Sequence, residues 1–218
     1  MACSDRSKFI EYCLFFIGIF MCVSELWKQY TLTFRINGGY YDWWYFPFQL
    51  CSIPMYLLVF FPVFRRSHIK SVFFTFLMDY SLLGGICVFL DTSGMYYPLA
   101  SLTVHSWLWH ILIIIAGILC GISKMADYTW NGFLQSGMLF SFFCIIATFL
   151  NLIIGKKAPI NMFYISPYYE MSQVIIADIT RQFGNNVRIF CYIAAIILGA
   201  AIFHLFWRRY LLRTCKKH

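Results

Sequence analysis

A cysteine and a histidine, each inside an apolar segment, are the residues of this chain best suited to catalysis. Cys51 lies between Pro47 and Pro54, and His110 lies in the apolar stretch 102–121. Ionisable groups deep inside a membrane span are rare and commonly mark functional sites. A thiol and an imidazole within reach of each other can act as nucleophile and base, and the imidazole favours formation of the thiolate. The alternative is that Cys51 only fills space in a core.

The two prolines around Cys51 are unusual in a segment that is apolar enough to enter a membrane. Each removes a backbone N–H donor, and in hydrocarbon the carbonyl left without a partner must find another one. A functional site is the economical explanation for this irregularity. Gln49 lies about 200° from Cys51 on a regular helix, so it joins the site only if Pro47 or Pro54 distorts the turn.

Further polar residues are expected to approach this pair from neighbouring segments. At 1.5 Å per residue, Cys51 lies roughly 7 Å and His110 roughly 12 Å below the nearer membrane surface, and Asn151 lies about 5 Å below it. The candidates for binding or orienting a substrate are Gln49, Asn151, Asn161 and Tyr164, and the possible relay carboxylates are Asp79 and Glu25.

Two other histidines are expected to lie outside this site. His105 is five residues from His110 and therefore about 140° away around the same helix. His204 lies near the cytoplasmic end of the last apolar segment, and we expect it at the membrane interface. Asp79 lies nearer the middle of the membrane, where we expect a structural or relay carboxylate.

The composition identifies the elements that must position these residues as membrane helices. The chain has 218 residues, of which 61% are hydrophobic, 21% aromatic and 12% charged. Soluble domains have about 45–50% apolar and about 25% charged residues. The fold class is therefore predicted to be all-α, a polytopic membrane helix bundle forming a single domain over residues 1–218. A span needs about 20 mostly apolar residues, and six such stretches are found near 9–27, 46–64, 71–90, 102–121, 133–154 and 189–207.

The distribution of lysine and arginine predicts the orientation of this bundle. With six spans, eleven of the 17 basic residues fall on the side that holds both termini. The other six are Lys28, Arg35, Lys156, Lys157, Arg181 and Arg188. The excess predicts that both termini are cytoplasmic and that the loop 155–188 caps the outer end of the bundle. The net charge of +8 then reflects topology and lipid headgroups, and no nucleic-acid partner is expected.

The nine cysteines do not predict a disulfide framework or a metal site. Their number is odd, no CxxC motif occurs, and most of them lie inside the expected spans, where cysteine behaves as a small apolar residue. No metal and no cofactor are expected. The sequence leaves the oligomeric state open.

Three blocks of this sequence resemble a known family. They are Trp44–Ser52 (WYFPFQLCS), His105–His110 (HSWLWH), and Asn151 followed by Asn161–Pro167 (NMFYISP). Their order and spacing are similar to the YwaF-like family of bacterial integral membrane proteins. That family is related to a eukaryotic membrane acyltransferase that remodels ether phospholipids through a cysteine.

The resemblance covers more than half of the chain and implies roles for two residues. It implies that Cys51 is the acyl-accepting cysteine and His110 the membrane histidine, in a bacterial cell membrane. Many relatives have histidine at the position of Gln49, so this chain departs from the family pattern there.

The sequence analysis therefore predicts a lipid acyltransferase. In this hypothesis the Cys51 thiol attacks a phospholipid ester, His110 transfers the proton, and Asn151 and Asn161 orient the substrate or donate to the oxyanion. The partners are membrane phospholipids and lysolipids, and water as the acceptor would make the protein a lipase. The alternative is a small transporter or lipid-binding protein, in which Asp79, His110 and Asn151 line a polar pathway. Transporters often contain paired halves with broken helices, and no such repeat is evident here.

Overall fold

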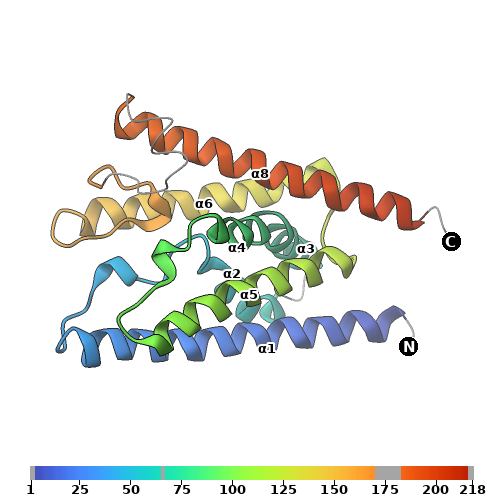
Figure 1. Ribbon diagram of the computed structural model, residues 1–218. Helices are drawn as coiled ribbons and strands as arrows, with labels where there is room; N and C mark the ends of the chain where they lie inside the picture. Colours follow the sequence, from blue (N-terminus) through green and yellow to red (C-terminus); the bar gives the residue numbers. More distant parts are fainter. Residues whose placement is uncertain (1–2, 65–66, 170–182, 216–218) are drawn as a thin grey trace.

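The structure, a computed structural model, describes residues 3–64, 67–169 and 183–215 and is built from helices (Figure 1). No strand occurs among these residues, so the predicted all-α class is confirmed. Five helical stretches are long and apolar enough to cross a membrane, and they are Ser7–Ile36, His68–Leu90, Ala100–Ile122, Trp130–Ile154 and Gly184–Arg213. They correspond to five of the six predicted spans.

Three of these five stretches are single α-helices, and two contain π-helical turns. The single helices are α5 (Ala100–Ile122), α6 (Trp130–Ile154) and α8 (Gly184–Cys215). The first stretch is α1 (Cys3–Tyr30) continued by a π-helix over Thr31–Ile36. The remaining stretch joins α3 (Ser67–Phe76), a π-helix over Leu77–Ser81, α4 (Leu82–Cys87) and a 3₁₀ turn over Val88–Leu90. Such π-turns inside helices are frequent at functional sites.

The second predicted span differs from the structure. A single helix was expected over residues 46–64, but α2 covers only Ile53–Phe60 and ends in a 3₁₀ turn over Phe61–Val63. The residues before it form a 3₁₀ turn at Trp43–Tyr45 and then irregular backbone. Prolines explain both boundaries, because Pro54 lies in the first turn of α2, where its missing N–H costs nothing, and Pro62 weakens the last turn.

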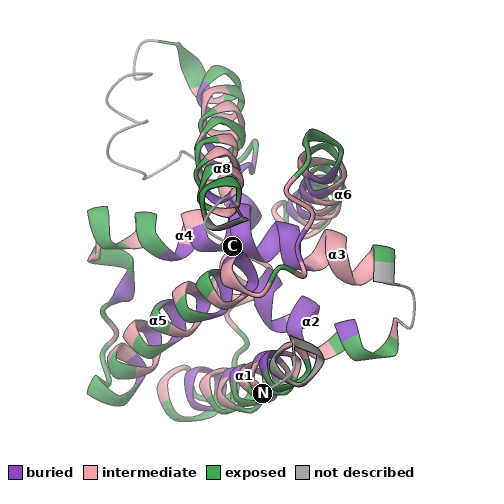
Figure 2. Cartoon of the chain, turned by 90° about the vertical axis from the view of Figure 1, so that its right-hand side faces the viewer, coloured by how far each residue is buried: buried purple, intermediate pink, exposed green. Residues whose placement is uncertain are grey.

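The stretch formed by α3, the π-helix and α4 lies at the centre of the bundle. Of its most apolar window, 56% is buried inside the protein, compared with 22% for α6 and 17% for α8. Figure 2 shows the same arrangement, with the buried residues gathered on α2 and the central stretch and the exposed ones on the outer helices. Glycine permits one close approach here, since a Cβ at Gly117 of α5 would lie 2.7 Å from the Leu82 Cβ.

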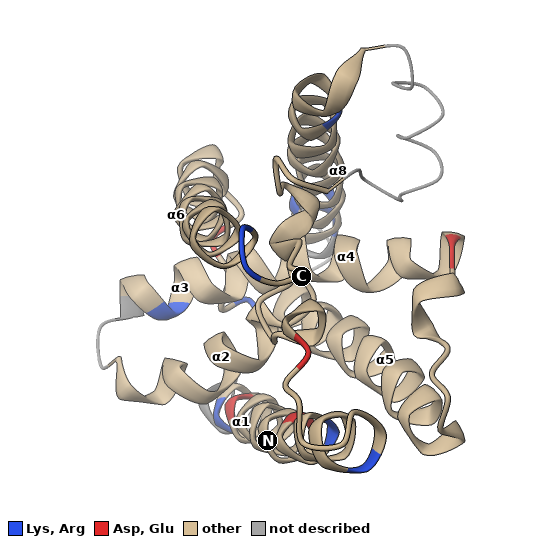
Figure 3. Cartoon of the chain, turned by 90° about the vertical axis from the view of Figure 1, so that its left-hand side faces the viewer, with Lys and Arg blue, Asp and Glu red and all other residues tan. Residues whose placement is uncertain are grey.

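The start of α1 and the end of α8 lie at the same end of the bundle (Figure 1). The segment 37–64 must therefore return the chain along the bundle between α1 and α3, even though α2 is short. The opposite end holds the turn after α1, the turn before α5 and the described part of the loop after α6. Viewed from that end, charged residues are few and scattered (Figure 3). Residues 170–182 of the predicted capping loop lie outside the described residues.

Candidate functional site

The residues just before α2 form a turn, and this turn positions Gln49. The backbone N–H of Ser52 donates to the Gln49 carbonyl at 2.8 Å. The Gln49 side chain reaches the loop after α6, where Nε2 donates to the Asn161 carbonyl at 2.9 Å and Oε1 accepts from the Phe163 N–H at 2.8 Å. The distortion that Gln49 needs in order to leave the helical position is therefore present.

Two asparagines hold the same loop from the other side. Asn151, which is fully buried near the end of α6, donates from Nδ2 to the Met162 carbonyl at 3.0 Å and accepts the Met162 N–H at Oδ1 at 2.7 Å. Asn161 accepts the Ser166 N–H at its Oδ1 at 2.9 Å. Both ends of the Asn151 amide are thus used by the backbone.

These three amides fix a turn whose backbone is strained. Phe163 and Tyr164 both have a φ of 56°, which is the left-handed region that non-glycine residues rarely adopt. Such a conformation costs on the order of 1–3 kcal/mol per residue and persists only when its surroundings hold it. The buried Phe163 ring packs against Phe48, with ring centroids 5.9 Å apart. The arrangement therefore links the turn that carries Cys51 to the loop that carries Tyr164.

Cys51 lies in the same turn, half-buried, two residues before α2 begins. Its carbonyl accepts a hydrogen bond from the indole Nε1–H of Trp109 at 3.0 Å. This bond joins the turn to α5, one residue away from His110.

His110 is buried, with 8% of its surface exposed, and its hydrogen bonding determines its tautomer. Its Nδ1 lies 2.8 Å from the Ser106 carbonyl one turn earlier. A carbonyl only accepts, so Nδ1 carries the proton and Nε2 presents its lone pair. No partner for Nε2 occurs in the described part of the chain. A neutral imidazole with a free Nε2 lone pair is the form that a general base requires. His105 turns instead toward Trp27 of α1, at a ring distance of 5.8 Å.

A buried ion pair on α1 lies beside this group. Glu25 is 4% exposed, and its Oε1 accepts from Lys28 Nζ at 2.8 Å and from Gln29 Nε2 at 2.7 Å. Gln29 also donates to the Tyr45 carbonyl at 2.7 Å. The Lys28 ammonium is within electrostatic range of both the Cys51 thiol and the His110 ring. The Oε2 of Glu25 is buried and has no partner among the described residues.

The Glu25 carboxylate also contributes to the raised pKa values of Tyr41 and Tyr97, two tyrosines in the loops at this end. Burial, and after it the carboxylates of Glu25 and Asp42, raise the pKa of Tyr41 to about 12. Burial also raises the pKa of Tyr97, and the anionic forms of Tyr45, Cys51, Glu25 and Tyr164 would each raise it further. Tyr97, in the loop before α5, is therefore within electrostatic range of Cys51, Glu25 and Tyr164.

Tyr164 connects this group to α8 through a ring contact. Its ring meets the Tyr192 ring edge to face, with centroids 6.1 Å apart. The hydroxyl of Tyr192 is within electrostatic range of Tyr164, Cys51 and Cys144. The two tyrosines thus stand between the Cys51 turn and the contact of α6 with α8.

A relay carboxylate for Cys51 would have to bond a residue of the group around Cys51. Asp79 instead bonds His204. Its Oδ2 lies 2.8 Å from Nδ1 of His204, and both side chains are fully buried. Nε2 of His204 lies 3.1 Å from the Thr129 carbonyl. The expectation that His204 serves the membrane interface is therefore wrong. A histidine on α8 can reach the core because α8 packs directly on the π-helical turn that carries Asp79.

The hydrogen bonds of this pair determine how many protons it holds. The Thr129 carbonyl can only accept, so Nε2 of His204 carries a proton. The 2.8 Å contact between Nδ1 and Oδ2 needs a second proton, which belongs either to the imidazole or to the carboxyl. In both arrangements the pair is neutral overall, which is the form that burial in hydrocarbon favours.

Of the residues predicted from the sequence, Gln49, Asn151 and Asn161 meet on one loop, and Cys51, Glu25 and Tyr164 are within electrostatic range of Tyr97. Three further residues of this group were not predicted. Lys28, Tyr97 and Trp109 were not singled out. Lys28 was counted only as a topology charge, and Trp109 stood unremarked beside His110 in the HSWLWH block. Nothing in the sequence marked Tyr97, because its place depends on how the loop before α5 folds over the bundle.

Comparison with known proteins gives one match. No curated protein and no solved structure matches the chain. A family model, that of the TMEM164 family, matches residues 3–206, which is nearly the whole chain. This is a family of membrane proteins, in agreement with the five apolar helices. The YwaF-like resemblance stays a prediction. The chain described here is thus a member of the TMEM164 family.

Proposed function

We propose that this protein is a lipid acyltransferase of the membrane interior, with Cys51 as its nucleophile. The observation that carries the proposal is the hydrogen bond from Trp109, the neighbour of His110, to the Cys51 carbonyl, because it joins the turn of a half-buried thiol to the helix of an imidazole whose Nδ1 is already bound to Ser106. Burial disfavours the Cys51 thiolate, and the positive charge of Lys28 offsets only part of this effect.

The reaction divides into two acyl transfers. The Cys51 thiol gives its proton to His110 Nε2, and the thiolate attacks the ester carbonyl of a phospholipid. The ester C–O bond breaks, a thioester forms, and the lysolipid alkoxide takes the proton back from the imidazolium. A second lysolipid then gives its hydroxyl proton to His110 and attacks the thioester, which releases the Cys51 thiolate to be reprotonated. Water in place of the second lysolipid would give a free fatty acid.

The predicted orienting residues take different parts in this proposal. The Asn161 Nδ2 would donate to the oxyanion, whereas Asn151 and Gln49 use their amides to hold the loop. Gln49 cannot act as a base because an amide does not bind a proton near neutral pH. The proposal therefore gives the proton transfers to His110 alone and treats Gln49 and Asn151 as positioning residues.

The test is a search for the thioester. Protein purified from membranes and incubated with a phospholipid should gain the mass of one acyl group at Cys51, and hydroxylamine should remove it. Cys51→Ala should lose both the adduct and the exchange of acyl groups between labelled phospholipid and lysolipid. Cys120→Ala, which removes a fully buried thiol from α5, should retain both. Full exchange activity in Cys51→Ala would overturn the covalent mechanism and favour a transport or lipid-binding role.

A further inference from the structure

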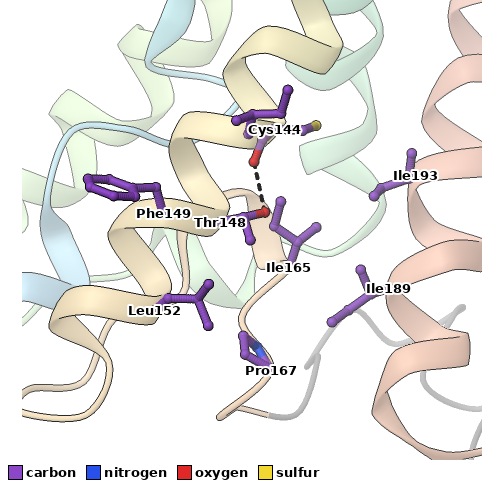
Figure 4. A pocket seen from close by; sticks show the side chains of 9 residues that line it. Cys144, Thr148, Phe149, Leu152, Ile165, Pro167, Ile189 and Ile193 are labelled. Atoms are coloured by element: carbon purple, nitrogen blue, oxygen red, sulfur yellow. Dashed lines mark hydrogen bonds between the residues drawn. The ribbon is translucent and has the colours of Figure 1, made fainter.

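A groove between α6 and α8 lies next to the candidate site and has no part in the chemistry above. Its volume is about 490 Å³, which is within the range of about 300–1,000 Å³ typical of ligand clefts. Figure 4 shows its walls, with Thr148 and Leu152 on α6, Ile189 and Ile193 on α8, and Ile165 and Pro167 between them. The loop residue Ile165 directly follows Tyr164, so one wall is built by the strained turn.

The lining offers no polar group to a ligand. Its one hydroxyl, that of Thr148, donates to the Cys144 carbonyl of its own helix at 2.9 Å. The remaining lining side chains are apolar apart from the Cys144 thiol. A ligand that needs hydrogen bonds or a countercharge would lose its hydration here without compensation. The groove therefore suits a hydrocarbon chain.

The position of the groove between two membrane-spanning helices gives lipid acyl chains direct access to it. Both of its walls belong to helices apolar and long enough to cross a membrane. Phe149, at the edge of the groove on α6, is 62% exposed and faces outward. In a bilayer, side chains exposed at this depth meet lipid tails. An acyl chain can thus enter from the side without crossing water.

Two residues of the groove lining are the sequence neighbours of a tyrosine pair, Tyr164 and Tyr192. Ile165 and Ile193 line the groove, and their neighbours in sequence, Tyr164 and Tyr192, meet ring to ring at 6.1 Å. The Tyr192 hydroxyl is within electrostatic range of both Cys144, in the groove, and Cys51, in the site. The tyrosine pair therefore adjoins the groove and lies within electrostatic range of Cys51.

We propose that this groove binds one acyl chain of a bilayer phospholipid and that the tyrosine pair holds the ester end of that chain near Cys51. The link to Cys51 rests on the proposed function, while occupancy of the groove by an acyl chain does not. A chain that moves from bilayer to groove exchanges one apolar environment for another, so packing within the groove, and not the hydrophobic effect, must select it.

The test is photolabelling in lipid vesicles. The full-length protein is reconstituted in phosphatidylcholine vesicles that contain a trace of phosphatidylcholine with a diazirine in one acyl chain, irradiated, and mapped by peptide mass spectrometry. Labels should concentrate on the groove residues of α6 and α8. Ile193→Trp and Leu152→Trp, which fill the groove from opposite walls, should each lower this labelling several-fold.

The matched control is Ile197→Trp, one turn further along α8, which is 37% exposed and does not line the groove. It should leave the groove labelling unchanged. Equal labelling of the groove and of the exposed face of α1 would show only bulk lipid contact and would overturn the proposal. Unchanged labelling in both groove-filling variants would do the same.

Cys51→Ala separates this proposal from the proposed function. The variant should keep the groove labelling, because occupancy needs no nucleophile. Groove labelling together with full exchange activity in Cys51→Ala would refute the covalent mechanism and leave the groove intact. A thioester on Cys51, together with an unaltered preference for acyl chain length in Ile193→Trp and Leu152→Trp, would refute the link between the groove and Cys51 and leave the mechanism intact.

Discussion

The hydrogen bond from Nδ1 of His110 to the Ser106 carbonyl decides what this histidine can do. It fixes the tautomer and leaves Nε2 as an acceptor, while His105 on the same helix packs between two tryptophan rings. Two histidines five residues apart therefore have separate roles. This difference can be tested, since His105 packs between two rings and its buried Nε2 has no hydrogen-bond partner among the described residues, whereas the tautomer of His110 is fixed by Ser106.

Replacing His110 by alanine should lower the rate of acyl exchange by about 10²–10⁴, the usual contribution of a general base. His105→Phe, which keeps a ring between Trp27 and Trp109, should stay near the parental rate. The measurement is transfer of a labelled acyl group to a lysolipid by purified protein. Equal losses in both variants would show that His110 acts only through packing.

Asn151 is a positioning residue whose loss should be visible in stability. Asn151→Leu removes partners from two backbone groups of Met162, and each buried group left unsatisfied costs about 1–3 kcal/mol. The thermal midpoint in detergent should fall clearly, and acyl exchange should fall with it because the turn at Phe163 and Tyr164 loses its support. Ser141→Ala, an exposed position on the same helix, is the control and should change neither. A stable Asn151→Leu protein would contradict this assignment.

At the scale of elements, the π-helical turn over Leu77–Ser81 connects α3 to α4 in the central stretch. It carries Asp79, and the chain of contacts from Asp79 through His204 to the Thr129 carbonyl ties the central stretch to α8 and to the start of α6. The second carboxyl oxygen, Oδ1, is buried with no partner in the described part of the chain. The Asp79–His204 pair therefore connects three elements, although Oδ1 of Asp79 makes no hydrogen bond within the described residues.

Breaking this pair on one side should destabilise the bundle strongly. His204→Leu leaves the Asp79 carboxyl buried alone, and removal of one partner from a buried pair costs about 3–5 kcal/mol. Asp79→Leu with His204→Leu removes both polar groups and should recover much of that loss. Thermal unfolding of the two single variants and the double variant in detergent gives the coupling energy. Additive losses would show that the two residues do not interact.

At the scale of the whole molecule, the ends of the chain share one end of the bundle (Figure 1). Six crossings would place the larger number of basic residues on that side, as predicted from the sequence. The Cys51 turn, the loop after α6 and the entrance of the groove lie at or toward the other end. The orientation of the bundle therefore decides which membrane leaflet the candidate site faces.

The positive-inside rule predicts that both termini are cytoplasmic. Reporters fused before Met1 and after His218 should each be active only in the form that works in the cytoplasm, with an externally active reporter as the matched comparison. Activity of the external reporter at either end would reject this orientation and would place the Cys51 turn in the inner leaflet.

The sequence by itself determined the class of the molecule and the position of five spans. Runs of about 20 apolar residues can be satisfied in hydrocarbon only as helices, so composition and periodicity are sufficient for that conclusion. The prolines marked the segment around Cys51 as unusual, although a single helix was expected there over residues 46–64. These properties depend on neighbours along the chain.

Tertiary structure alone decided how short α2 is, that His204 meets Asp79, and that Lys28, Tyr97 and Trp109 belong to the group around Cys51. Each of these depends on which faces of distant helices pack together, a choice that apolar periodicity leaves open because lipid and protein interior are almost equally apolar. The groove between α6 and α8 is the same kind of feature. Its walls come from segments more than 30 residues apart, and nothing local in either helix distinguishes the face that lines it from the face that meets lipid.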